Sequence, residues 1–160
     1  MLIQEMTHQE NIDLLARTRL SRLACDHEGQ PYITPMYFEY KDHFLYSFST
    51  LGQKIIWMRA NPLVCVEVDE LANPHDWSTV IVMGTYEELL DKAEDQNRAY
   101  DLHQGWPMWW EPGYVKTILH GKTRPLERVY FRIRINQITG HRGVAETLSG
   151  QESSAKDEGP

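Results

Sequence analysis

The chain is short of several features that would assign it to a familiar class. It has only two cysteines, Cys25 and Cys65, and no C-x-x-C pair, which favours reduced core thiols over a disulfide framework or a zinc knuckle. Seven histidines are scattered without an H-E-x-x-H motif, so we assign no metal site. The 16 lysines and arginines are outnumbered by 23 aspartates and glutamates, and the net charge of −7 argues against a nucleic-acid partner.

Long apolar runs are also missing. No stretch approaches the length of a membrane span, and the first residues, MLIQEMTHQE, lack the basic-then-apolar order of a signal peptide. We therefore expect a soluble, cytoplasmic protein with no membrane partner. The 160 residues, 41% of them hydrophobic, are enough for one hydrophobic core, and this predicts a single globular domain.

Most of the chain has the alternation and the turn signals of β-strands. The strand-like segments are LSRLACD, PYITPMYFEY, HFLYSFS, VCVEVD, STVIVMGTYEEL and the alternating run Val129–Asn136. They predict a mainly β fold, a small closed or nearly closed antiparallel barrel, because closure removes unpaired sheet edges. In PYITPMYFEY both faces are largely apolar, so we expect a second subunit to cover the outward face.

Helical segments interrupt this pattern in three places. Thr7 and Glu10 have the form of a capping box, which predicts a short helix running to about Arg17. A compact helix is predicted for Gln53–Ala60, and an exposed helix for Asp91–Gln104. Both segments are bounded by turn-forming or helix-capping residues.

The end of the chain changes in composition. From about Glu146 it consists mainly of Gly, Ser, Glu and Lys and has no aromatic residue. Such a segment cannot bury enough apolar surface to fold. We therefore predict one domain over residues 1–145 and a disordered tail over residues 146–160.

The segment LYSFSTLGQKIIWMRANP is the most informative part of the chain for function. A strand passes through Gly52 into a helix that carries Lys54 in its first turn. A cation there opposes the helix dipole, so Lys54 is better explained if an anion such as a phosphate is shared with free N–H groups and the hydroxyls of Ser47 and Ser49. The alternative is a solvated lysine beside two strand-end serines, and the local motif alone favours that alternative.

The order of the segments from SRLACDHEGQPYITPMYF to YFRIRINQITG resembles the pyridoxamine 5′-phosphate oxidase-like, FMN-binding split-barrel proteins, on the side that includes the nitroimidazole-resistance proteins. The resemblance covers about Leu14 to Gly140, and its most specific part is the run Gly-x-Lys … Asn-Pro-x-Val-Cys-x-Glu-Val. It implies a six-stranded antiparallel split β-barrel, an active homodimer, and two FMN molecules in grooves between the subunits.

The resemblance also implies a set of cofactor-binding positions. They are Arg22, Pro35, Met36, Tyr37, Ser47, Ser49, Gln53, Lys54, Ser78 and Thr79. Those near the start of the helix at Gln53 match the family's phosphate-binding segment, and those in the strand over residues 31–40 lie along the isoalloxazine ring through their backbone. Arg22, Ser78 and Thr79 match polar positions of the cofactor groove.

Departures from the family pattern limit what the resemblance implies about mechanism. Phe48 stands where many nitroimidazole-resistance relatives carry a histidine, so a mechanism through that histidine is not carried over. The Arg-x-His of pyridoxamine phosphate oxidases is not matched in ITGHRGVAE, which argues against vitamin B6 oxidation. No residue is identified as catalytic.

Two clusters have open roles under this interpretation. Trp106, Trp109 and Trp110 either pack in a core or interface, which we favour, or stack on a flavin or a flat substrate. A basic stretch is either a set of solvated faces, which we again favour, or a contact for the phosphates of NAD(P)H. It comprises Lys122, Arg124, Arg128, Arg132 and Arg134.

The sequence therefore predicts a homodimeric FMN-binding flavoprotein, an oxidoreductase that takes a hydride from NAD(P)H and passes electrons to a small organic acceptor. The alternative is a non-catalytic flavin- or haem-binding sensor or carrier on the same fold. A haem would need an axial ligand such as His75 or His120, and the sequence favours neither.

Overall fold

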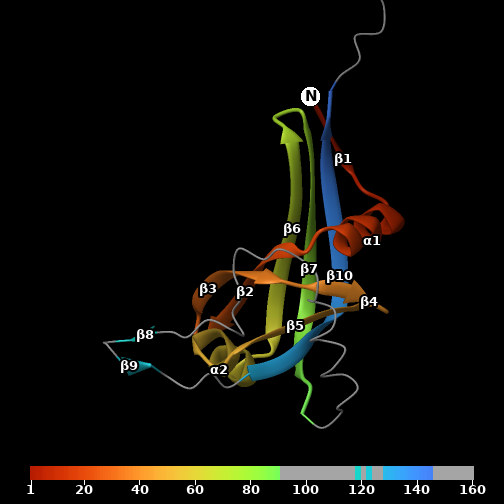
Figure 1. Cartoon of the computed structure of the whole chain (residues 1–160). Coiled ribbons are helices and arrows are strands. Elements are labelled where there is room, and N and C mark those ends of the chain that lie inside the picture. Colours follow the sequence, from red (N-terminus) through yellow and green to blue (C-terminus); the bar gives the residue numbers. More distant parts are fainter. Residues whose placement is uncertain (91–117, 120–121, 124–127, 146–160) are drawn as a thin grey trace, which may run out of the picture.

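The computed structural model describes residues 1–90, 118–119, 122–123 and 128–145 (Figure 1). The predicted helix Asp91–Gln104, the tryptophan cluster, Arg124 and the predicted tail lie outside these residues. The described elements are β1 (Leu2–Glu5), α1 (His8–Arg17), β2 (Leu20–His27), β3 (Gln30–Tyr37), β4 (Glu39–Lys41), β5 (Phe44–Thr50), α2 (Gln53–Ala60), β6 (Leu63–Asn73), β7 (Asp76–Glu88), β8 (Ile118–Leu119), β9 (Lys122–Thr123) and β10 (Arg128–Val144).

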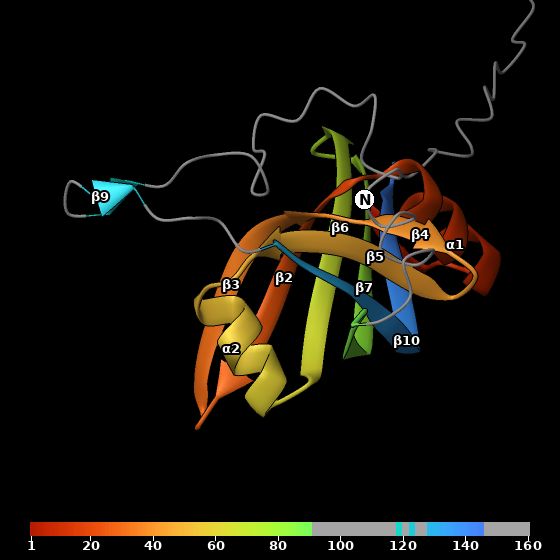
Figure 2. The same ribbon diagram turned by 60° about the horizontal axis from the view of Figure 1, so that its bottom comes forward.

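Within the described residues, an eight-stranded antiparallel sheet has the order β3-β2-β6-β7-β10-β5-β4, with β1 added along β10. The two ends of this order, β3 and β4, are consecutive in the chain and are separated only by Phe38. One bent segment therefore pairs with β2 through its first part and with β5 through its last part, and this closes the barrel (Figure 2). The predicted split barrel with short helices is confirmed, and β1 and the β8–β9 pair are additions to it.

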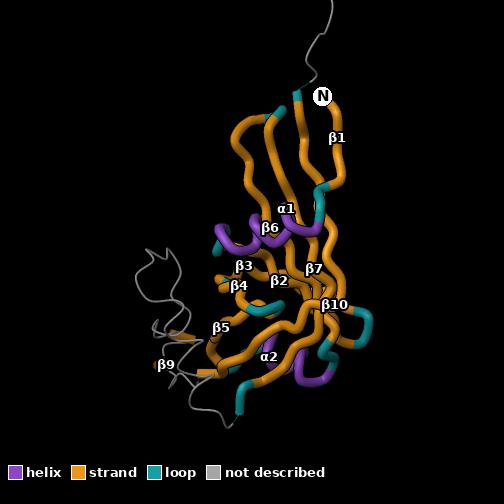
Figure 3. The backbone as a smooth tube through the Cα atoms, turned by 90° about the vertical axis from the view of Figure 1, so that its right-hand side faces the viewer, coloured by secondary structure: helices purple, strands orange, loops and turns teal. Residues whose placement is uncertain are grey.

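Strands β6, β7 and β10 continue beyond the barrel as an extension, which α1 crosses on one side (Figures 1 and 3). The sequence predicts the last strand only over Val129–Asn136, whereas β10 runs from Arg128 to Val144. A bulge between Ile135 and Gln137 lies just past the last residue that pairs with β5. Beyond the bulge the inward-facing positions are shifted by one residue. The alternation of apolar and polar residues is therefore interrupted, and the second half of the strand does not continue the pattern of the first.

The barrel core is built from the inward-facing residues of its strands. They include Leu23, Cys25, Met36, Phe38, Leu45, Val64, Val66, Val68, Val80, Val82, Phe131 and Ile133. Phe38 and Phe131 meet edge to face, with ring centroids 6.1 Å apart. The two described helices cover this core, α1 through Leu14 and Leu15 and α2 through Ile55 and Met58. In the described part of the chain, neither helix has the length and apolar composition of a membrane span.

The predicted capping box is present at the start of α1. Glu10 N donates to Thr7 Oγ1 at 3.3 Å, and Thr7 N donates to Glu10 Oε2 at 2.7 Å. Thr7→Ala removes the side-chain acceptor, so the free energy of unfolding in urea is expected to fall by about 0.5–2 kcal/mol. Thr7→Ser, which keeps the acceptor, is the control. Equal stability of Thr7→Ala and the wild type would contradict this cap.

Candidate functional site

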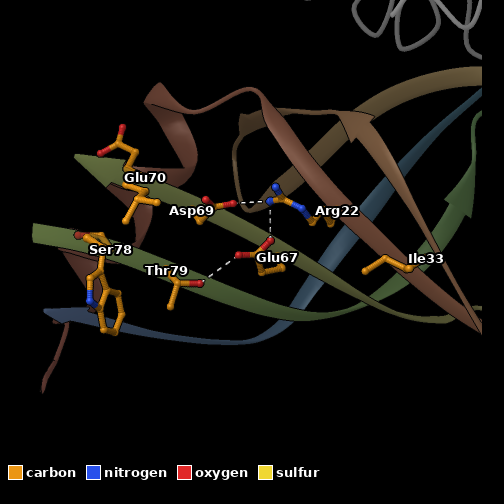
Figure 4. A pocket seen from close by; sticks show the side chains of 9 residues that line it. Arg22, Ile33, Glu67, Asp69, Glu70, Ser78 and Thr79 are labelled. Atoms are coloured by element: carbon orange, nitrogen blue, oxygen red, sulfur yellow. Dashed lines mark hydrogen bonds and ion pairs between the residues drawn. The ribbon is translucent and has the colours of Figure 1, made fainter. Parts of the chain in front are cut away.

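A pocket of about 530 Å³ lies on the outer face of the sheet, where β2, β6 and β7 run side by side (Figure 4). Its lining residues are Arg22, Ile33, Glu67, Asp69, Glu70, Leu71, Trp77, Ser78 and Thr79. Arg22, Ser78 and Thr79, three of the predicted cofactor positions, therefore meet at one place. Pro35, a fourth, is the Cα partner of Arg22 across the β2–β3 pair. We call this cavity the outer pocket.

Carboxylates hold Arg22 in the outer pocket. Its Nη1 forms ion pairs with Glu67 Oε2 at 3.1 Å and with Asp69 Oδ1. Hydrogen bonds to Asp69 and Glu67 raise the pKa of the guanidinium. Thr79 Oγ1 donates to the other oxygen of Glu67 at 3.3 Å, as the dashed lines of Figure 4 show. This network fixes two hydrogen-bonding groups, Arg22 and Thr79, relative to each other.

The acidic character of the outer pocket is not among the features predicted from the sequence. Glu67, Asp69 and Glu70 oppose the single positive charge of Arg22, and Glu70 is paired with Arg17 of α1 at 2.8 Å. A signal was present, because the alternation in VCVEVDE places the first two carboxylates opposite the buried valines. The apolar part of the lining consists of Ile33, Leu71 and Trp77. Such a pocket suits a flat ring with polar edges better than a phosphate.

Next to the outer pocket, four apolar or weakly polar side chains lie in register across β3, β2, β6 and β7. They are Ile33, Ala24, Cys65 and Met83, and we call them the outer apolar row. Ile33 is 64% exposed and Met83 51% exposed. The row corrects one prediction, because Cys65 is half-buried on the outer face rather than in the core, while Cys25 is buried as predicted.

Lys54 lies in the first turn of α2, which has no acidic residue in that turn and no side-chain cap at Gly52. The lysine is half-buried, and no described residue forms an ion pair or hydrogen bond with it. Burial lowers the pKa of its ammonium below the ordinary value of 10.5, an effect that the nearby Cys25 thiol opposes in part. Partial burial of a cation without a partner lowers stability, and an anion beside Lys54 would offset this cost.

The predicted serines of β5 point toward the barrel interior. Ser47 is 1% exposed, and its Oγ donates to the carbonyl oxygen of Tyr37 at 2.7 Å. Ser49 is fully buried, and its Oγ has no hydrogen-bond partner. Because the Ser47 hydroxyl is already used inside the barrel, this placement argues against direct contact between Ser47 and a bound phosphate. Met36 is likewise a core residue, so only its backbone is available to a cofactor.

Five of the ten predicted site residues thus form two groups, of which only one lines the outer pocket. Arg22, Ser78 and Thr79 line the outer pocket, whereas Lys54 and the exposed Gln53 belong to α2 and are not part of that lining. The described residues contain no group of three or more His, Cys, Asp or Glu arranged to hold a metal ion.

Comparison with known proteins shows relatives along most of the chain. The family model described as pyridoxamine 5′-phosphate oxidase matches residues 7–142. An uncharacterized protein of Rhizobium meliloti is 34% identical over 151 residues, which cover 92% of this chain and 100% of that protein. A solved FAD-binding protein from Mesorhizobium loti is 39% identical with a TM-score of 0.75, covering 89% of this chain and 99% of that one.

A more distant solved structure supports the same fold. The FAD binding protein from Mycobacterium smegmatis is 22% identical with a TM-score of 0.62, covering 87% of this chain and 98% of that one. The family match extends from the start of α1 to Arg142, two residues before the end of β10, and so it includes every strand of the closed barrel. The chain therefore belongs to the pyridoxamine 5′-phosphate oxidase-like family of flavin-binding split-barrel proteins.

Proposed function

We propose that this protein is an FMN-dependent oxidoreductase that acts as a homodimer and passes electrons from NAD(P)H to a small organic acceptor. The observation that carries the proposal is Lys54, a half-buried ammonium at the start of α2 without an anionic partner among the described residues. Burial removes water that would stabilise the charge of the ammonium, and a phosphate beside Lys54 would replace that stabilisation. Family membership supports a flavin as the source of that phosphate, and FMN is the flavin that we propose.

The outer pocket supports a place for the flavin ring. Trp77 and Ile33 supply apolar surface, and Arg22 and Thr79 supply hydrogen-bonding groups held in place by Glu67. A bound flavin would supply the chemistry of hydride transfer and electron transfer. The residues of the outer pocket would orient the flavin ring and exclude water from one face of the ring. The carboxylates of the pocket would repel the phosphate, so that it lies outside the outer pocket.

A second copy of the chain would join the two groups of site residues. The outer apolar row lies beside the outer pocket, and its end residues are exposed in one chain. A two-fold symmetric contact between two copies of the row would bury this apolar surface and would bring each outer pocket next to the partner subunit. In this arrangement Lys54 and the outer pocket that serve one flavin come from different subunits. This proposal also explains why the described part of a single chain does not bring Lys54 into the outer pocket.

The haem alternative finds less support in the described part of the chain. His75 is exposed in the turn between β6 and β7, and it is not among the residues that line the outer pocket. His120 lies outside the described residues. A buried axial ligand beside an apolar cavity would be needed for a haem.

The visible spectrum of the purified protein tests the proposal. We expect a yellow flavin spectrum that bleaches on addition of NADPH or NADH without oxygen, because a bound flavin then accepts a hydride. Cofactor released by heat is expected to co-elute with FMN rather than FAD. Release of FAD would contradict the cofactor assignment, a flavin that neither nucleotide reduces would favour the sensor or carrier, and a Soret band would favour haem.

A further inference from the structure

Trp77 of β7 lies at the end of the outer pocket nearest the turn between β6 and β7. In the sheet it pairs with Leu71 of β6 on one side and with Gly143 of β10 on the other, and Gly143 pairs in turn with Ile3 of β1. Side chains at positions paired in this way point to the same face of the sheet. Leu71, Trp77 and Ile3 therefore form a row on the outer face, with a gap at the glycine.

The indole of Trp77 fills this gap and lies flat on the sheet. A Cβ built at Gly143 would be 2.4 Å from Trp77 Nε1, 2.8 Å from Cε2 and 2.9 Å from Cδ1, the last two being the ring atoms bonded to Nε1. A point in the plane of the ring beyond the nitrogen would be much farther from these two carbons than from the nitrogen. The nearly equal distances therefore place that Cβ over the face of the ring. Since Cβ atoms point away from the sheet, the ring lies parallel to the sheet.

One face of the indole is thus covered by the backbone of Gly143. Trp77 is nevertheless only half-buried and lines the outer pocket, and its neighbours in the row, Leu71 and Ile3, are exposed. The second face of the indole is therefore directed away from the sheet, on the side of the pocket. A tryptophan that served only to fill a core would have both faces covered. The arrangement is instead a flat aromatic surface whose lower side is fixed.

Thr79 connects this aromatic surface with the cofactor positions. It is a predicted cofactor position that lines the outer pocket, and it lies two residues from Trp77 on the same face of β7, about 7 Å away. A tricyclic ring is longer than this separation, so a ring held at Thr79 can extend over the indole, and aromatic rings attract each other in offset stacks. On the basis of the proposed function, we propose that the indole of Trp77 stacks on the isoalloxazine ring of the bound flavin. Trp77 is then a cofactor-binding residue outside the predicted set, and Gly143 is a positioning residue that acts through it.

Riboflavin bound to the full-length apo protein tests the stacking, because it carries the ring without the phosphate. An indole in contact with a flavin ring quenches the fluorescence of the flavin, since the excited ring accepts an electron from the indole. Bound riboflavin is therefore expected to be dim in the wild type and brighter in Trp77→Leu. Its affinity should fall roughly 2- to 10-fold in this variant, as expected for the loss of one aromatic pair. Trp77→Tyr keeps a quenching ring and should restore both properties in part.

Gly143→Ala tests the glycine while Trp77 stays in place. The added methyl group takes the space beneath the ring, so the indole must tilt or move, and bound riboflavin should again become brighter. If Trp77 served only the fold, Trp77→Leu would lower the melting temperature of the apo protein and leave the fluorescence of bound riboflavin as in the wild type. That result would overturn the stacking but not the proposed function, whereas failure of the wild type to bind riboflavin or FMN would overturn both.

Discussion

Lys54→Ala is expected to weaken FMN binding roughly 10- to 150-fold and to leave riboflavin binding unchanged. A charge-assisted hydrogen bond between the ammonium and the phosphate contributes about 1.5–3 kcal/mol. Lys54 has no competing partner among the described residues, so this contribution is not diminished by an existing ion pair. Riboflavin lacks the phosphate and therefore reports on the ring site alone.

Titration of apo protein with FMN and with riboflavin measures both affinities, and Arg59→Ala is the matched control. Arg59 is a second cation on α2, but its Nη2 is already paired with Glu88 at 2.7 Å. Its removal should leave the ratio of FMN to riboflavin affinity as in the wild type. Equal loss of both ligands in Lys54→Ala would indicate damage to the fold, and an unchanged FMN affinity would remove Lys54 from the site.

The lowered pKa of Lys54 adds a pH dependence to the same experiment. In the apo protein the ammonium loses its proton below pH 10.5, earlier than in the unfolded chain. The unfolded chain therefore binds more protons in this window, and the contribution of Lys54 to stability rises with pH between its lowered pKa and 10.5. Bound phosphate favours the charged form, so FMN affinity should fall as pH rises through the window. Lys54→Ala should lose this dependence.

Met83→Asp is expected to convert the proposed homodimer into a monomer and to reduce flavin binding strongly. Met83 is an exposed member of the outer apolar row. An unpaired carboxylate buried in an interface costs about 3–5 kcal/mol, and a two-fold contact contains the change twice. The dissociation constant of the dimer should therefore rise at least about ten-thousandfold. Sedimentation at micromolar protein concentration measures the association, and the flavin absorbance of the same samples measures cofactor retention.

Leu2→Asp is the matched control for this prediction. Leu2 on β1 is 49% exposed, close to the 51% of Met83, but it lies outside the outer apolar row. It should leave the dimer intact. Phe38 is unsuitable for such a test although it belongs to the apolar strand found in the sequence, because it is 1% exposed within the core. A monomeric wild type that retains FMN would refute the proposed assembly.

Local patterns in the sequence were sufficient to predict much of the fold. The structure confirms the capping box at Thr7, and α1 ends at Arg17 as predicted. It also confirms the helix Gln53–Ala60 with both of its predicted ends. These signals depend on residues a few positions apart, and the physical interactions behind them are equally local. Strand β1 escaped prediction because it is short and exposed, and because its ladder partner β10 is distant in the chain.

The candidate site was less accessible to sequence reasoning. Arg22, Ser78 and Thr79 were found only through the family resemblance, and nothing local shows that they share a pocket. The outer apolar row depends on the register of four strands, which a single sequence does not specify. The inward direction of Ser47 follows from its alternation with Leu45 along β5, since both residues pair with core positions of β10.

The place of β10 in the sheet has a consequence for how the protein forms during synthesis. This strand is made last among the barrel strands, yet it lies between β7 and β5 and pairs with both. Until Arg128 and the residues after it leave the ribosome, two neighbouring strands have an open edge and the apolar interior is exposed to water. A nascent chain halted before that point should therefore be prone to aggregation, and native packing should be acquired in a single late step.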